Sequence, residues 1–183
     1  MASAAVSMRS MLGVPASTTS TSDSILVIID AQNEYATGKL AVSDVEASRA
    51  KIASLLEKYR VAKAPVIHVV HEVPAGAPLF TPGTELAEEF SELKPLEEES
   101  VVTKNFPGSF TGTNLEDLLK ATGRNKVVLT GYMASEKGWD VIVVEDAVGD
   151  RDIPGANAQE LTKVALAEIA DAFGTVVKSQ DIA

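Results

Sequence analysis

The sequence contains no cysteine. This excludes a disulfide, a thiolate metal site and a thiol nucleophile for the chain as printed. Histidine is nearly as scarce, and its two copies, His68 and His71, lie three residues apart in an expected strand. Side chains at that spacing point to opposite faces of a strand, so they do not readily share one ion. We therefore expect no metal site, and we expect no cofactor.

Positive charge and long apolar runs are also in short supply. Lys and Arg number 16 against 26 Asp and Glu, which gives a net charge of −10 and a pI of about 4.7. Such a balance argues against general binding to nucleic acid or to an anionic membrane surface. No apolar run approaches the roughly 18 residues of a membrane span. A small anionic substrate remains possible, because one Lys or Arg can dominate inside a pocket.

The N-terminal stretch differs in composition from the rest of the chain. Residues 1–23 are small and polar and lack the continuous apolar run of a secretory signal. We expect a flexible tail over 1–23, one domain over 24–183, and a cytoplasmic location, with non-classical secretion left open. The length of 183 residues and the 45% hydrophobic content suit a single domain with a sizeable core.

Strand-like and helix-like patterns alternate along the expected domain. Apolar runs typical of buried parallel strands occur at 24–29, 64–70, 100–103, 126–130, 140–145 and 175–178. Helical spacing occurs at 43–60, 114–122 and 157–173, and a short acidic helix is expected within 85–93. Ser43 and Glu46 form a capping-box pattern at the start of the first helix. The alternation predicts an α/β sandwich with a mainly parallel sheet.

The strands expected at 126–130 and 140–145 lie unusually close in the sequence. Parallel neighbours need a crossover of about a dozen residues or more, usually a helix, whereas antiparallel neighbours can form a hairpin. The rest of the pattern favours a parallel pair. We therefore interpret the short stretch between them as a connection whose crossover helix is missing.

Polar residues stand at the carboxyl ends of the expected strands, where α/β proteins bind ligands. They include Asp30, His71, Lys104 and Tyr132. Asp30 at the mouth of an apolar cleft suits proton exchange, although a strand-end Asp can also cap a turn. Lys104 suits either a substrate carboxylate or the charged form of Asp30, although an isolated lysine is usually exposed.

Several segments together resemble the isochorismatase-like hydrolase superfamily, also called the cysteine hydrolases. They are LVIIDAQNEY, VIHVVHE, PLFTPGTE, VVTKNFPGSFTGTNLEDLL, VVLTGYMA and VIVVEDAVGDRDIPG, in that order through nearly all of 24–183. The resemblance implies a Rossmann-like three-layer α/β/α fold and a homodimer or homotetramer. It also implies a small-molecule substrate.

The resemblance also implies roles for individual residues. Asp30 matches the catalytic aspartate, Lys104 the catalytic lysine, and the backbone N–H of Met133 part of an oxyanion hole. Positions expected to line the substrate pocket are Gln32, Tyr35, His71, Phe106 and Tyr132. In the amidohydrolase members a cysteine follows shortly after the segment that matches GYMA. Here Ser135 and Glu136 follow it at once, so the nucleophile has no counterpart.

Three interpretations of this departure remain open. The protein carries a crossover segment that the printed sequence omits, or the segment is deleted and the variant is inactive. Alternatively the chain is an enzyme that needs no thiol, like isochorismatases that protonate a vinyl ether with the aspartate. The favoured function is hydrolysis of a small anionic metabolite, isochorismate, to dihydroxy-dihydrobenzoate and pyruvate. The alternatives are a C–N amide hydrolase of the nicotinamidase or carbamoylsarcosine type and a catalytically inactive binding protein.

Overall fold

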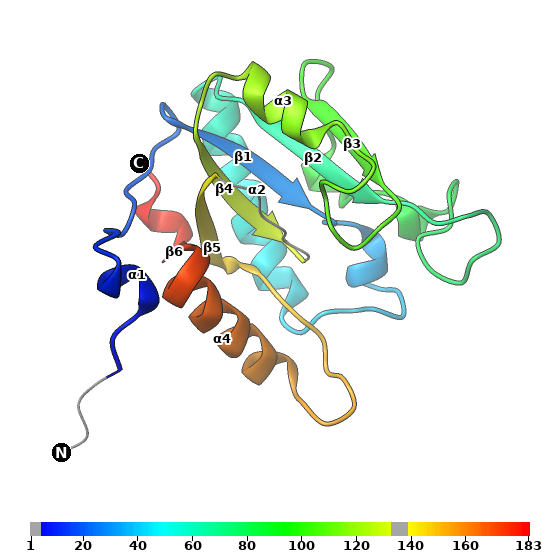
Figure 1. The fold of residues 1–183 in the computed structure, drawn as a ribbon. Helices are drawn as coiled ribbons and strands as arrows, with labels where there is room; N and C mark the ends of the chain where they lie inside the picture. The colour runs from blue at the N-terminus through cyan, green and yellow to red at the C-terminus, as the bar shows by residue number, and fades with distance from the viewer. Residues whose placement is uncertain (1–4, 133–138) are drawn as a thin grey trace.

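The computed structural model describes residues 5–132 and 139–183, which form a six-stranded sheet flanked by helices (Figure 1). The strands are β1 (Ser24–Ile29), β2 (Val66–His71), β3 (Ser100–Lys104), β4 (Lys126–Gly131), β5 (Asp140–Val148) and β6 (Gly174–Val177). Their order across the sheet is β3-β2-β1-β4-β5-β6, and every neighbouring pair is parallel. The predicted α/β fold with a parallel sheet is confirmed.

The helices cover the two faces of the sheet in separate groups. α2 (Val45–Val61) lies on one face, and α3 (Leu115–Ala121) and α4 (Ala158–Glu168) lie on the other (Figure 1). The apolar run of β1 explains this arrangement, because successive side chains of a strand point to opposite faces. Leu26 and Ile28 pack on the α2 side, and the alternate residues of the strand pack on the other side. A strand buried on both faces is thus the centre of a three-layer sandwich.

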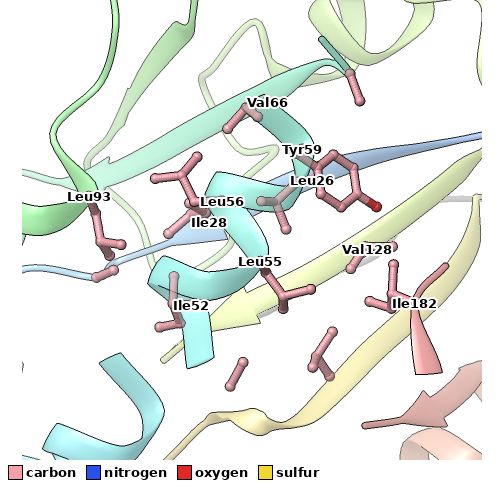
Figure 2. Packing of buried hydrophobic residues seen from close by; sticks show 14 of the residues in the cluster. Leu26, Ile28, Ile52, Leu55, Leu56, Tyr59, Val66, Leu93, Val128 and Ile182 are labelled. Carbon is pink, nitrogen blue, oxygen red and sulfur yellow. The ribbon is translucent and has the colours of Figure 1, made fainter. Parts of the chain in front are cut away.

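The core on the α2 side is built from the apolar stripe of that helix. Ile52, Leu55, Leu56 and Tyr59 are at most 2% exposed and pack against β1 and its neighbours (Figure 2). Burying such a side chain stabilises the fold by about 1.5–3 kcal/mol. The Tyr59 hydroxyl keeps a polar partner, the Ser24 hydroxyl, at 2.6 Å. The spacing that predicted the helix is therefore the spacing that anchors it to the sheet.

The start of α2 differs from the capping box expected at Ser43 and Glu46. Asp44 is the N-cap residue, with a left-handed φ of 53° and no side-chain cap hydrogen bond. The backbone N–H of Ser43 instead donates to the Asp150 carbonyl at 2.9 Å. This tertiary bond ties the entry of the helix to the loop after β5, and it overrides the local capping pattern.

The short elements lie mainly in the loops at the ends of the strands. They are α1 (Met8–Met11), the 3₁₀ turns Asn33–Tyr35, Glu85–Ala87, Ser91–Leu93 and Ser179–Asp181, and a π-helical turn, Ile169–Phe173, that continues α4. The acidic helix expected within 85–93 is therefore two separate turns. Between them, Glu89 bridges Gln32 and the Phe90 N–H donates to the Ala31 carbonyl. These bonds pull the segment against the loop after β1 and interrupt the helix.

The N-terminal segment makes definite contacts with the edge of the sheet. The Ser17 N–H donates to the Thr175 hydroxyl at 2.9 Å, and the Ser17 hydroxyl donates to Asp140 at 2.6 Å. Further along, the Thr21 N–H donates to the carbonyl of Ala183. Ser17 and Thr21 therefore connect this segment to β5, β6 and the C-terminus.

β4 and β5 form a parallel pair, with Lys126 opposite Asp140. This agrees with the interpretation of the sequence that rejected a hairpin. Only residues 132–139 connect the two strands, fewer than the dozen or so that a parallel crossover usually needs. Met133 and the junction from Ala134 to Glu136 lie outside the described residues.

Gly131 ends β4 in a conformation that suits glycine alone. Its φ is 103°, and a β-carbon there would overlap the Ile29 carbonyl oxygen. The register with β5 shifts at this point, so that Gly131 lies opposite Val148. The backbone N–H of the next residue, Tyr132, donates to the Ile29 carbonyl at 3.0 Å. This close approach places Tyr132 beside the loop that follows β1.

Candidate active site

Asp30 and Lys104 form a buried ion pair at the carboxyl ends of β1 and β3. The Lys104 Nζ lies 2.8 Å from the Asp30 Oδ2, and the two side chains are 0% and 1% exposed. Asp30 directly follows β1 with a left-handed φ of 53°, and its N–H donates to the Val69 carbonyl. Lys104 reaches the aspartate across the end of β2, because β2 separates β3 from β1. Two residues far apart in sequence thus meet without contact with solvent.

The Lys104 ammonium has acceptors for all three of its protons. Besides Asp30, it donates to the Pro107 carbonyl at 3.1 Å and, more weakly, to the Phe106 carbonyl at 3.5 Å. A lysine with three protein acceptors has little capacity left for a substrate carboxylate. Of the two roles considered for Lys104, the geometry therefore favours orienting Asp30 and balancing its charge.

Burial changes the acidity of Asp30. Loss of solvent raises the pKa of its carboxyl to about 6, although the charge and hydrogen bond of Lys104 act in the opposite direction. The second oxygen, Oδ1, is buried and has no hydrogen-bond partner among the described residues. A carboxyl with a raised pKa and one uncommitted oxygen is suited to exchange a proton with a bound molecule.

Gln32, expected to bind substrate, is occupied by the backbone around it. Its Oε1 accepts from the His71 N–H at 2.8 Å. Its Nε2 donates to the His71 carbonyl at 2.9 Å and to the Ala87 carbonyl at 2.7 Å. The side chain is fully buried. Its amide therefore holds the end of β2 and the 85–87 turn in place, and any effect on a ligand is exerted through His71.

Aromatic rings form a wall beside the ion pair. The ring centroid of Tyr35 lies 5.3 Å from that of Phe80 and 5.3 Å from that of Tyr132. The His71 ring packs edge-on against Phe80, with a centroid distance of 5.0 Å. Burial raises the pKa of the Tyr35 hydroxyl, and the negative charge of Asp30 adds to this effect, so Tyr35 stays neutral. The structure thus brings Tyr35, His71 and Tyr132 together through these ring contacts, and their role as pocket residues stays a prediction.

Phe106, which was expected to line the pocket, is not part of this wall. The side chain of Phe106 is 54% exposed, and the residue contributes its carbonyl to Lys104. Met133, expected to supply an oxyanion-hole N–H, lies outside the described residues. A contact that sequence reasoning missed is the hydrogen bond of 2.8 Å between the hydroxyls of Ser48 and Tyr132. The helical spacing could have predicted that Ser48 is buried, because it lies one turn before Ile52 on the buried face of α2.

A cavity of about 560 Å³ lies next to the aromatic wall, between α2, α4 and the end of β5. Its lining includes Ser48, Gly149 and Asp150, but neither Asp30 nor Lys104. Gly149 and Ser48 both adjoin the Tyr132 side chain, which belongs to the aromatic wall. We place the candidate site at the ion pair, because that is where a carboxyl with a strongly raised pKa is found.

Two further properties follow from the described residues. No group of three or more His, Asp or Glu side chains among them is arranged to hold a metal ion. Within the same residues, no helix is long and apolar enough to cross a membrane.

Comparison with known proteins assigns the family. The isochorismatase domain matches residues 24–181. A secreted isochorismatase effector of Verticillium dahliae is 65% identical, and the alignment covers 96% of this chain and 98% of that protein. The crystal structure of an isochorismatase from Pseudomonas putida KT2440 superimposes with a TM-score of 0.90 at 27% identity and covers 98% of this chain and all of that one. The structure of N-carbamoylsarcosine amidase from Thermoplasma acidophilum has a TM-score of 0.73 at 26% identity and covers 87% of this chain and 98% of that one.

The fold and these matches define a hydrolase with a parallel, three-layer α/β/α fold. The chain belongs to the isochorismatase family. The Verticillium relative is described as secreted, which contradicts the cytoplasmic location expected for this chain. That expectation rested on the lack of a continuous apolar run in residues 1–23.

The alignment with the Verticillium protein is longer than this chain. It extends over 187 positions, whereas this chain has 183 residues. The relative therefore contains residues that have no counterpart here.

Proposed function

We propose that the protein hydrolyses isochorismate to 2,3-dihydroxy-2,3-dihydrobenzoate and pyruvate. The observation that carries this proposal is the buried Asp30 with its raised pKa and its uncommitted Oδ1. Cleavage of a vinyl ether begins with protonation of carbon by an acid, and it needs no thiol. A chain without cysteine can therefore perform this reaction, whereas it lacks the nucleophile for amide hydrolysis. The matches to isochorismatases support the same reaction class.

In this scheme each residue of the site has a separate role. Asp30 donates a proton to the terminal carbon of the vinyl ether, and Lys104 keeps the carboxyl oriented and stabilises the carboxylate that results. Tyr35 and Tyr132 provide an aromatic wall for the cyclohexadiene ring, and Gln32 holds His71 in place. The test is incubation of the purified protein with isochorismate and detection of pyruvate. A protein that is folded and releases no pyruvate would contradict the proposal.

The alkaline side of the pH profile should report the Asp30 carboxyl. Its pKa is raised from 3.8 to about 6, so the proton needed for catalysis is retained up to that pH and lost above it. At one pH unit above the pKa about a tenth of the acid form remains, so kcat/KM should fall roughly tenfold per unit beyond pH 6. This fall in kcat/KM is measured from initial rates of pyruvate release between about pH 5 and about pH 9, roughly the range in which folded proteins are stable. A rate that stays flat to pH 8 would exclude Asp30 as the acid.

An amide-hydrolase function is the second candidate. It is favoured by the structural likeness to the carbamoylsarcosine amidase and by the extra residues of the Verticillium relative. It requires that the protein carry a cysteine-bearing segment near Ala134 that the printed sequence omits. Intact mass spectrometry of the protein from its natural source decides this. A mass of 19.2 kDa, that of the printed sequence, would remove the amidase candidate, and a larger mass would restore it.

We also propose that the protein acts outside the cell that produces it. The support is the secreted relative, which is 65% identical over nearly its whole length. The expected result is immunodetection of the protein in culture medium in which a cytosolic marker is undetectable. Detection in the cell extract alone would contradict secretion.

A further inference from the structure

His71 is placed beside the ion pair by the register of the sheet. It ends β2 and lies directly opposite Lys104, the last residue of β3. Residues paired in a parallel sheet project to the same face, so the imidazole and the ammonium stem share one side of the sheet. The Nδ1 atom of His71 is buried and has no hydrogen-bond partner among the described residues. The ring carries the site's second uncommitted polar atom, after the Oδ1 of Asp30.

The position of this ring is fixed by its own backbone. Gln32 accepts from the N–H of His71 and donates to its carbonyl, so both backbone groups are held by one side chain. On the other side the ring packs edge-on against Phe80, which has a left-handed φ of 46° and is 5% exposed. A ring held between a fixed backbone and a buried aromatic is pre-positioned, which is a requirement for efficient proton transfer.

The surroundings keep the imidazole neutral. Burial lowers the pKa of His71, and the positive charge of Lys104 lowers it further. The other groups held against it, Gln32 from the loop after β1 and Phe80 from the loop after β2, are uncharged. Burial acts in the opposite direction on Asp30, whose pKa is raised. Two titratable groups whose pKa values are shifted in opposite directions by their surroundings are typical of an acid and a base that act in one reaction.

We propose that His71 is a second catalytic residue, the general base that removes a proton from the water molecule attacking the vinyl-ether carbon. This assignment rests on the isochorismate hydrolysis proposed above. It goes beyond a pocket-lining role, because a residue that only binds substrate would affect KM, whereas a base affects kcat.

The proton transfers balance over one turnover. Protonated Asp30 gives its proton to the terminal CH₂ group, and the adjoining carbon becomes an oxocarbenium ion. Water adds to that carbon while His71 Nδ1 takes one of its protons, which produces a hemiketal. The imidazolium then protonates the leaving ring oxygen as the C–O bond breaks, and the Asp30 carboxylate takes the proton of the hemiketal hydroxyl. Pyruvate and the diol leave, and both groups return to their starting forms.

The test compares His71→Gln with the wild type over the pH profile of kcat. The wild type should show a bell-shaped profile, with an acid limb from His71 and an alkaline limb from Asp30. In His71→Gln we expect kcat to fall by about a hundredfold or more and the acid limb to disappear, while KM changes by less than about threefold. Glu72→Gln alters a charge one residue further along and should leave the bell shape unchanged. Thermal melting shows whether each variant is folded.

Chemical rescue separates a base from a structural residue. Added imidazole should restore part of the pyruvate release of His71→Ala, because the small base can occupy the space that the ring leaves. Retention of the acid limb and of kcat in His71→Gln would overturn this assignment alone, as would a change confined to KM. A folded wild type that releases no pyruvate would overturn the isochorismatase proposal together with this assignment.

Discussion

Replacing Asp30 with asparagine should reduce pyruvate release from isochorismate by about a hundredfold to ten-thousandfold, the usual contribution of a general acid. Asparagine has nearly the same shape but holds no transferable proton. It also leaves the ammonium of Lys104, which is 0% exposed, without its counter-ion. Loss of one partner of a buried pair costs about 3–5 kcal/mol, so the variant should also be less stable. The measurement is the initial rate together with the circular dichroism spectrum.

Two further variants separate lost chemistry from lost folding. Asp30→Asn combined with Lys104→Met removes both charges and should recover much of the stability while remaining inactive. Glu34→Gln is the matched control, since Glu34 is another buried carboxyl close to Asp30 in the sequence and its Oε1 accepts from the Lys39 N–H at 2.7 Å. It should keep most of the activity. Wild-type rates in folded Asp30→Asn would refute the role given to Asp30.

Replacing Gly131 with alanine should destabilise the fold by about 2–6 kcal/mol, the sum of left-handed strain and overpacking. The β-carbon would overlap the Ile29 carbonyl oxygen, and neither backbone can move without breaking the pairing of β1 with β4. A domain of this kind is stable by about 5–15 kcal/mol, so the variant should be markedly less stable than the wild type and should fail to fold if the wild type lies near the lower end of that range. Urea denaturation followed by circular dichroism measures the loss.

Gly123→Ala is the control for backbone strain alone. Gly123 also has a left-handed φ, 70°, but a β-carbon there would meet no atom within 4 Å. The free energy of unfolding of Gly123→Ala should therefore fall by only about 1–2 kcal/mol, the cost of the left-handed conformation for a residue other than glycine. Equal losses in the two variants would show that the contact with Ile29 is unimportant.

The elements that could be predicted from sequence are those with a strong local pattern. The run SILVII predicted β1 with its observed bounds, because five consecutive apolar residues after Ser24 are stable only when buried on both faces. The periodicity of 43–60 located the start of α2 to within two residues, although the predicted capping box of Ser43 and Glu46 was wrong. Capping depends on which tertiary partner takes the Ser43 N–H, and no local pattern reveals that partner.

The candidate site was predictable in part for the same reason. The position of Asp30 and Lys104 at strand ends follows from the alternation of strands and helices, and family resemblance singled out the same two residues. The commitment of Gln32 to the backbone of His71 could not be predicted, since it joins segments 39 residues apart. Phe106 was placed in the pocket because it is aromatic, but the turn after β3 directs its carbonyl toward Lys104 and leaves its ring in solvent.

By itself the sequence determined the fold class and the family, because these depend on composition, periodicity and the order of motifs along the chain. Only the tertiary structure decided that Asp30 is buried against Lys104 and that His71 presents an uncommitted nitrogen at the same edge of the sheet. The physical reason is that acidity and orientation depend on which groups exclude water from one another. That exclusion is a property of contacts between distant segments.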